Sequence, residues 1–208
     1  MKYYIYISDA KVDMLLPQIP RAAKRKIATE FKIDLKVLSA SRKAETDISE
    51  DRITRLEAVS SFIREYGNVG SIANPDAYIF DSMTLRMAIL HYRYLYFGGQ
   101  TENTILGLSG SVFHLLGHQN GPQLKGAFVT SSLLTGVVAS MQSSSLSSSD
   151  NLNLYRATER ANMSMKGLNV PEEKFEFLAR RLLYEPADEQ YRTHNLLLAT
   201  PLYVSIND

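Results

Sequence analysis

Two short polar clusters contain residue types that could bind a ligand, and each follows a predicted strand. The first comes after an aromatic and β-branched run at residues 3–7, and the second ends an alternating run at 33–41. The candidate ligand-binding residues of these clusters are Ser8, Asp9, Ser39, Ser41, Arg42 and Lys43.

The position of these clusters predicts an anion site. In open sheets of parallel strands, ligands bind beyond the carboxyl ends of the strands. If the two runs are parallel neighbours, hydroxyl groups and two cations meet at one rim, and Asp9 could accept from a ribose or a base. The alternative has equal weight: Asp9 caps a helix, and Arg42 and Lys43 belong to a solvated loop.

The run Gly-Leu-Ser-Gly-Ser at 107–111 resembles several catalytic loops without matching one. A nucleophile elbow requires glycine where Ser111 stands, a P-loop requires a Gly-Lys-Ser/Thr ending, and the dinucleotide fingerprint requires another glycine spacing. What remains is a group of small residues between a strand and a short helix, where Ser109 and Ser111 could present backbone N–H donors to an anion. The alternative, to which we give more weight, is a glycine-permitted turn with Ser109 or Ser111 as N-cap.

His114 and His118 have the i, i+4 spacing that places two imidazoles on one helical face. The residues between them lack the glutamate of zinc peptidase helices, and no acidic residue lies close by in sequence to complete a metal site. We therefore expect no metal here and interpret the histidines as a surface or helix-end pair. His114 and Asp9 remain candidates for acid–base chemistry if the fold brings them within hydrogen-bond distance.

The bulk composition limits the classes of function. The 208 residues have a net charge of +1, with 22% charged and 45% hydrophobic residues, which argues for a globular protein without a broad nucleic-acid surface. The absence of cysteine excludes disulfides, thiolate metal sites and thiol nucleophiles. No run approaches the ~20 apolar residues that span a bilayer, and no signal peptide is visible, so we expect a soluble cytoplasmic protein with no cofactor.

The elements that must position these residues predict one domain of the α/β or α+β class. The chain starts β-α-β-α with a parallel strand pair, and an aromatic hairpin or meander follows at about 77–109. We expect helices at 21–31, 48–68, 133–141 and 170–185, a serine-rich loop at 142–150, and a C-terminal strand that joins the sheet. The helix at 170–185 has Pro171 in its first turn, acids early and arginines late.

Three blocks of the sequence resemble a known family in the same order. They are "YYIYISDAKVDMLLPQIP" at the start, "YFGGQTENTILGLSGSVFHLLG" in the middle, and "FEFLARRLL" with "LLLATPLYVSI" at the end. The chain resembles an uncharacterised family of bacterial proteins, classed as a domain of unknown function. The resemblance implies no catalytic residue, and it associates the chain with bacterial signalling or defence loci, where small α/β modules sense nucleotide signals.

Our leading hypothesis is a ligand-sensing or regulatory module of a bacterial signalling or defence system, which binds an anionic ligand at strand carboxyl ends. A nucleotide is one candidate for this anionic ligand. One alternative is a hydrolase, acting on phosphodiesters for example, that uses Asp9 or His114. Another is an interaction module without a ligand, which docks a protein partner or a second copy of the chain. The docking element would be the aromatic hairpin that holds Tyr92, Tyr94, Tyr96 and Phe97, or the basic helix face of Arg21, Lys24, Arg25 and Lys26.

Overall fold

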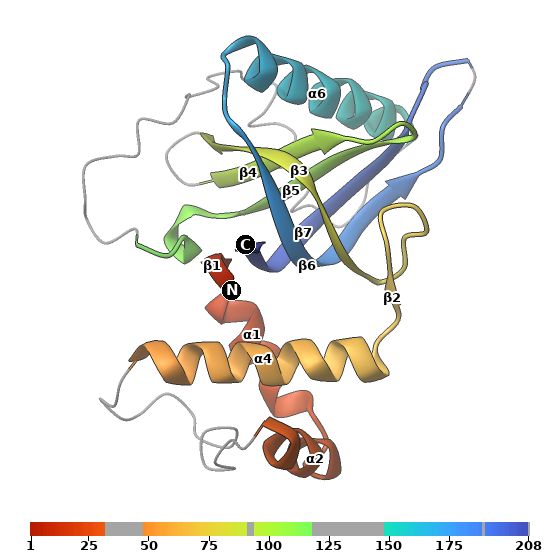
Figure 1. The fold of residues 1–208 in the computed structure, drawn as a ribbon. Coiled ribbons are helices and arrows are strands. Elements are labelled where there is room, and N and C mark those ends of the chain that lie inside the picture. Colours follow the sequence, from red (N-terminus) through yellow and green to blue (C-terminus); the bar gives the residue numbers. More distant parts are fainter. Residues whose placement is uncertain (32–47, 91–93, 118–147, 189, 208) are drawn as a thin grey trace.

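A closed β-barrel forms the centre of the computed structural model, which describes residues 1–31, 48–90, 94–117, 148–188 and 190–207 (Figure 1). Its five strands are β3 (Tyr78–Leu90), β4 (Tyr94–Gln100), β5 (Thr104–Ser111), β6 (Glu172–Glu185) and β7 (Asn195–Asn207). The first three form an antiparallel meander, β6 pairs with both β3 and β7, and β7 closes the barrel by pairing in parallel with β5. This strand order, with a helix between the third and fourth strands, is shared with the OB-fold.

Alternate residues of the barrel strands fill its interior. These buried side chains include Ile79, Leu85 and Ile89 of β3, Leu95 and Phe97 of β4, Leu106 and Leu108 of β5, Phe175 and Phe177 of β6, and Leu197 and Val204 of β7. The rings of Phe97 and Phe175 meet edge to face with 5.5 Å between centroids, a favourable aromatic arrangement. The barrel is therefore a packed core.

Helix α6 (Ser148–Gly167) packs on the outer face of β4 and β5 (Figure 1). The close approach requires a glycine, because a Cβ at Gly98 would collide with the side chains of Asn162 and Met165. Asn162 donates to the carbonyl of Gly99 (3.0 Å) and accepts from the hydroxyl of Tyr96 (3.0 Å). In OB-folds these two strands supply the surface that binds oligonucleotides, and in this protein the helix occupies it.

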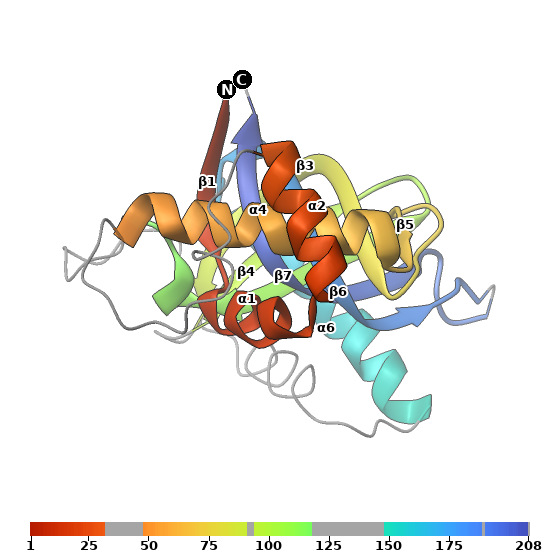
Figure 2. The same cartoon turned by 90° about the horizontal axis from the view of Figure 1, so that it is seen from below.

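The N-terminal elements pack away from α6 (Figure 1). β1 (Lys2–Ile7) pairs antiparallel with the end of β7, which places Lys2 opposite Asn207 (Figure 2). Helices α1 (Asp9–Leu15), α2 (Arg21–Phe31) and α4 (Ile48–Tyr66), with the 3₁₀ turn η1 (Leu16–Gln18), form a second apolar cluster against β6 and β7. The two-residue strand β2 (Val69–Gly70) then pairs in parallel with the start of β3.

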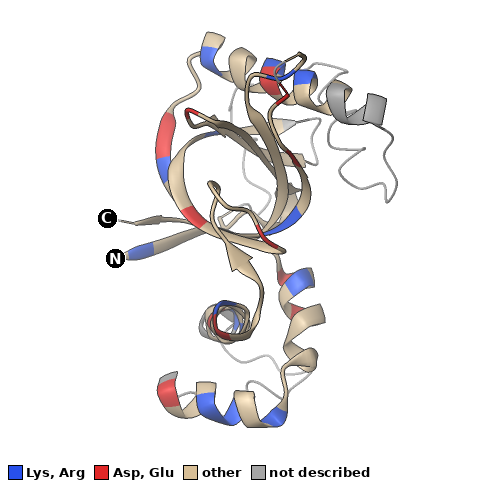
Figure 3. Cartoon of the chain, turned by 90° about the vertical axis from the view of Figure 1, so that its right-hand side faces the viewer, with Lys and Arg blue, Asp and Glu red and all other residues tan. Residues whose placement is uncertain are grey.

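Charged residues of both signs are distributed over the barrel and the helices (Figure 3). Several basic residues are paired with acids: Arg55 lies 2.7 Å from Asp13, and Arg86 lies 2.6 Å from Glu172. Within the described ranges, no helix is both long enough and apolar enough to cross a membrane.

The segment at 170–185, predicted as a helix, is instead the strand β6. Its alternate residues Phe175, Phe177 and Ala179 face the barrel interior, while Leu178 is buried on the outer face against the N-terminal helices. Burial on both faces hides the alternation that normally marks a strand. Pairing with β3 on one edge and β7 on the other overrides the helical propensity of the glutamates, leucines and arginines.

Other expectations are met in part. Helices at 21–31 and 48–66, the meander and the C-terminal strand are present, so the α+β class is confirmed. The parallel pair expected at the start is not confirmed, because the strand expected at 33–41 lies outside the described residues and the described partner of β1 is β7, antiparallel. The helix expected at 133–141 also lies outside them, and α6 begins at Ser148, within the expected serine-rich loop.

Candidate functional site

The carboxyl ends of β1 and β5 meet at the middle of β7. β5 runs parallel to β7 as far as the pair Leu108–Ala199, and β1 runs antiparallel to it from the opposite end as far as the pair Ile7–Tyr203. Both strands use one edge of β7 because β6 occupies the other edge. Residues 200–202 therefore lie at a gap in the sheet, with the residues after β1 on one side and the end of β5 on the other.

The pairing of β6 with β7 is irregular beside this gap. It skips Leu202 on β7 and Leu182 on β6, which makes two bulges within a few residues of each other. Bulges re-aim side chains and are frequent next to functional sites. Here Leu182 lines a cavity of about 320 Å³ at the gap, which we call the strand-end hollow. Its lining residues with polar groups on their side chains are Tyr6, Ser8, Lys11, Tyr94, Ser109, Ser111, His114 and Thr200.

Lys11 reaches from α1 into the gap. Its Nζ lies 2.8 Å from Thr200 Oγ1, 3.0 Å from the carbonyl oxygen of Pro201 and 3.4 Å from Ser8 Oγ. All three partners are neutral, and Lys11 makes no ion pair with any acid in the described part of the chain. Burial lowers the Lys11 pKa from 10.5 to about 8, since the charged form is poorly solvated.

Tyr6 is fully buried between the barrel core and the hollow. Its ring packs edge to face with Phe97, and its hydroxyl has no hydrogen-bond partner of normal geometry among the described residues. Burial raises the Tyr6 pKa to about 12, although the nearby hydroxyl of Ser8 and the backbone of Ser111 act in the opposite direction. Tyr6 therefore contributes an O–H donor that the fold leaves available beside Ser8.

The Gly-Leu-Ser-Gly-Ser run is part of strand β5 rather than the expected turn. Its backbone pairs with β4 through Tyr94 opposite Ser111, so the site gains the hydroxyls of Ser109 and Ser111 rather than a nest of free N–H groups. Ser111 also caps the 3₁₀ turn η2 (Val112–His114) by accepting from the N–H of Phe113 at 3.4 Å, as the N-cap interpretation expects. Gly110 is required for space, because a Cβ there would collide with the Tyr6 ring.

Asp9 lies beside the hollow but is committed to another partner. Its carboxylate binds Arg52 Nε at 2.7 Å, and the same guanidinium donates to the carbonyl of Ile7 at 3.1 Å. The Asp9 carboxylate is 4.0 Å from His114 Nδ1, beyond a hydrogen bond. Burial lowers the His114 pKa, and the Asp9 charge offsets this effect only in part. The two groups proposed for hydrolysis are thus neighbours without direct contact.

The structure therefore brings Ser8, Ser109 and Ser111 into one cavity and places Asp9 at its margin. The remaining candidates, Ser39, Ser41, Arg42 and Lys43, lie outside the described residues, as does His118. Lys11, Tyr6 and Thr200 are functional candidates that sequence reasoning misses. The one local signal is the Ser8–Lys11 spacing, which corresponds to about one turn of helix.

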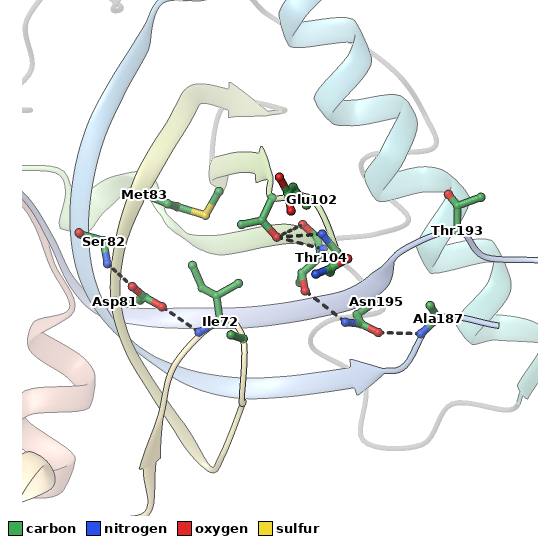
Figure 4. Close-up of a pocket in the computed structure, with 12 residues that line it drawn as sticks. Ile72, Asp81, Ser82, Met83, Glu102, Thr104, Ala187, Thr193 and Asn195 are labelled. Carbon is green, nitrogen blue, oxygen red and sulfur yellow. Dashed lines mark hydrogen bonds between the residues drawn. The ribbon is translucent and has the colours of Figure 1, made fainter. Parts of the chain in front are cut away.

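A second cavity, of about 650 Å³, opens at the other end of the β4–β5 hairpin (Figure 4). Its charged lining residues are the acids Asp81 and Glu102. The Asp81 carboxylate accepts from the N–H groups of Ile72 (2.9 Å) and Ser82 (2.8 Å), and Asn195 accepts from the N–H of Ala187 (2.7 Å). Because these polar groups hold neighbouring loops together, we interpret this cavity as a structural junction.

The chain matches a family model over nearly its whole length. Residues 2–208 match a family of unknown function (DUF7019), and the chain belongs to that family. The membership expected from the three sequence blocks is thereby confirmed. No curated protein and no solved structure matches the chain.

Proposed function

We propose that this family member binds a small anionic ligand, with a nucleotide as the main candidate, in the strand-end hollow. Binding would make it a ligand-sensing or regulatory module of a bacterial signalling or defence system. The observation that carries the proposal is Lys11, a partly buried ammonium group whose hydrogen-bond partners are all neutral.

The charge of Lys11 is unusual for this structure. Arg52, Arg55 and Arg192 are also partly buried, and each has a carboxylate partner within 3.3 Å. Burial of a charge is costly unless an opposite charge accompanies it, and the depressed Lys11 pKa expresses that cost. A bound anion would supply the missing partner.

The other polar groups of the hollow suit a phosphate. Ser109, Ser111 and Ser8 line the same hollow, and the Tyr6 hydroxyl makes no hydrogen bond of normal geometry within the described chain. Hydroxyl donors and one lysine form a common type of phosphate site, in which the lysine acts as a point charge. The cavity of about 320 Å³ is near the lower limit for small-molecule sites, which favours a ligand of mononucleotide size or smaller.

Thermal unfolding with AMP, ADP and cyclic AMP tests the proposal, with uncharged adenosine as the ligand control. A nucleotide at 100 times its Kd should stabilise the folded chain by about 2.7 kcal/mol, visible as a rise in Tm. Lys11→Met should abolish the rise, and Lys174→Met, which removes an exposed lysine from β6, should retain it. If no nucleotide raises the Tm, or if Lys11→Met leaves the rise unchanged, the assignment is wrong.

A further inference from the structure

The side chains of Ser8 and Lys11 lie close together, and binding of an anion does not by itself require this proximity. The hydroxyl of Ser8 follows the last residue of β1, and Lys11 lies one turn further on in α1, with Nζ 3.4 Å from Ser8 Oγ. Ser-x-x-Lys at the start of a helix is also the spacing of the nucleophile in a class of serine acyl-transfer enzymes. The barrel fold around it differs from theirs, so only the local geometry bears on this chain.

The surroundings of Lys11 fit both protonation states of its amine, since the charged form can donate to all three neighbours. A neutral amine has two N–H donors and one lone pair. The carbonyl of Pro201 can only accept, so it takes one N–H, and the hydroxyl of Thr200 can take the second. The third neighbour is Ser8 Oγ, which accepts from the charged Nζ at 3.4 Å; once Nζ has lost a proton, the Ser8 O–H can donate to its lone pair instead. In this arrangement the lone pair of a neutral Lys11 Nζ points toward the hydroxyl of Ser8.

We propose that Ser8 is a nucleophile, that Lys11 is its general base, and that the strand-end hollow takes a small acyl ester. The inference rests on the proposed function in using the same hollow and the same lysine. The serine hydroxyls would bind the ester, whose acyl end enters the hollow uncharged, because a bound anion would keep Lys11 protonated.

The protonation state of Lys11 suits this role. With a pKa of about 8, about a tenth of the lysine is neutral at pH 7 and half at pH 8, against a negligible fraction for an ordinary lysine. The other titratable groups at the hollow are Tyr6 from β1, Tyr94 from β4 and His114 from η2, and Asp9, at its margin, is paired with Arg52 of α4. None of these supplies a carboxylate in direct contact with Lys11.

The reaction is balanced with water as the only co-reactant. Ser8 Oγ forms a bond to the acyl carbon while its proton passes to Lys11 Nζ. The bond from that carbon to the leaving oxygen then breaks, and the leaving alcohol takes the proton back from Lys11. Water attacks the acyl-serine with Lys11 again as base, which releases the carboxylic acid and restores Ser8.

Tyr6 fits the remaining requirement of acyl transfer. The transition state places negative charge on the former carbonyl oxygen, and donors aimed at that oxygen stabilise it. The Tyr6 hydroxyl stays protonated up to about pH 12 and lies near the Ser8 hydroxyl and the Ser111 backbone, without a hydrogen bond of normal geometry to any described residue. A buried donor left unpaired is costly to the fold, which is expected where the partner is a substrate.

Covalent labelling with a fluorophosphonate probe tests the nucleophile on the full chain. Attack by Ser8 expels fluoride and leaves a stable phosphonate ester, which intact-mass measurement and peptide mapping locate. We expect labelling at Ser8, with a rate that rises with pH to a plateau above about pH 8. Ser8→Ala should abolish labelling, and Ser164→Ala, an exposed position on α6, should not change it.

Lys11→Arg separates this inference from the proposed function. Arginine keeps the positive charge but does not deprotonate, so AMP binding should persist while the labelling rate falls by about 100-fold or more. AMP binding without Ser8 labelling at any pH from 7 to 9.5 would overturn the nucleophile and leave the anion site standing. Ser8 labelling without AMP binding would overturn the anion site and leave the nucleophile standing. Equal labelling of wild type and Lys11→Arg, both shown to be folded by their melting curves, would also refute the base role.

Discussion

Binding of an anion in the strand-end hollow should draw protons from solution, because Lys11 changes its protonation state. In the free protein burial lowers the Lys11 pKa to about 8, so about half of the molecules carry the neutral amine at pH 8. A bound phosphate supplies the missing opposite charge and should return the pKa toward its ordinary value of 10.5. We therefore expect uptake of about half a proton per AMP bound at pH 8, and about nine tenths at pH 9.

Isothermal titration calorimetry measures this number directly. At fixed pH, the slope of the observed enthalpy against the ionisation enthalpy of the buffer equals the number of protons taken up. AMP contributes little above pH 8, because the second pKa of a phosphate monoester is about 6. His114 would behave differently: its pKa is already low, so its uptake should decline between pH 7 and pH 9 while that of Lys11 grows.

A weakened site provides the matched control for this measurement. Ser109→Ala removes one hydroxyl from the hollow, so it should raise the Kd for AMP while the proton uptake per bound AMP stays the same. Binding of AMP with identical enthalpies in two buffers at pH 8 would refute the reasoning, because the anion would then lie away from Lys11.

Three further changes test the fold around the site. Gly110→Ala adds a methyl group against the Tyr6 ring and should lower the free energy of unfolding by about 1–3 kcal/mol in urea denaturation; no change would mean that the ring can move aside. Phe177→Ala empties the barrel core and should cost about 3–5 kcal/mol by the same measurement, and a cost below about 1 kcal/mol would contradict its position. Burial opposes ionisation of Glu176, but hydrogen bonds from Lys2, Asn207 and Tyr203 outweigh it and hold its pKa below the usual value. The ionised Glu176 therefore stabilises the folded chain above the ordinary carboxyl pKa, and this stabilisation is lost as the pH falls through the pKa of Glu176 in the folded state. Glu176→Gln should flatten the decline of Tm below about pH 5. Parallel curves of Tm against pH for the variant and the wild type would contradict this.

Local signals in the sequence predict the helices of the N-terminal half well. α4 has an apolar stripe that includes Leu56, Val59 and Ile63, and all three are buried. The strand β6 fails the same approach because Phe175, Leu178 and Leu182 have helical spacing only by coincidence. Phe175 faces the barrel interior, Leu178 faces the helices outside it, and Leu182 is displaced by a bulge. Which face of β6 each side chain occupies depends on β3 and β7, which local periodicity does not describe.

The candidate site divides in the same way. A polar cluster after a strand is a local feature, and Ser8 is predicted for that reason. Lys11 acquires its properties from Thr200 and Pro201, which lie 189 and 190 residues away in sequence. The hollow exists because β1 and β5 share an edge of β7, and a single sequence does not encode that pairing in any local pattern.

The position of β7 has a consequence for the order of events during synthesis. β7 pairs with β1, β5 and β6, yet it is translated after all three. Until β7 has left the ribosome, each of the three strands has an edge without its pairing partner, and the barrel cannot close. Folding must therefore wait for contacts that span almost the whole chain, which slows it and leaves the nascent protein open to aggregation. Binding of the newly made chain by chaperones would be the observable sign of this delay in the cell.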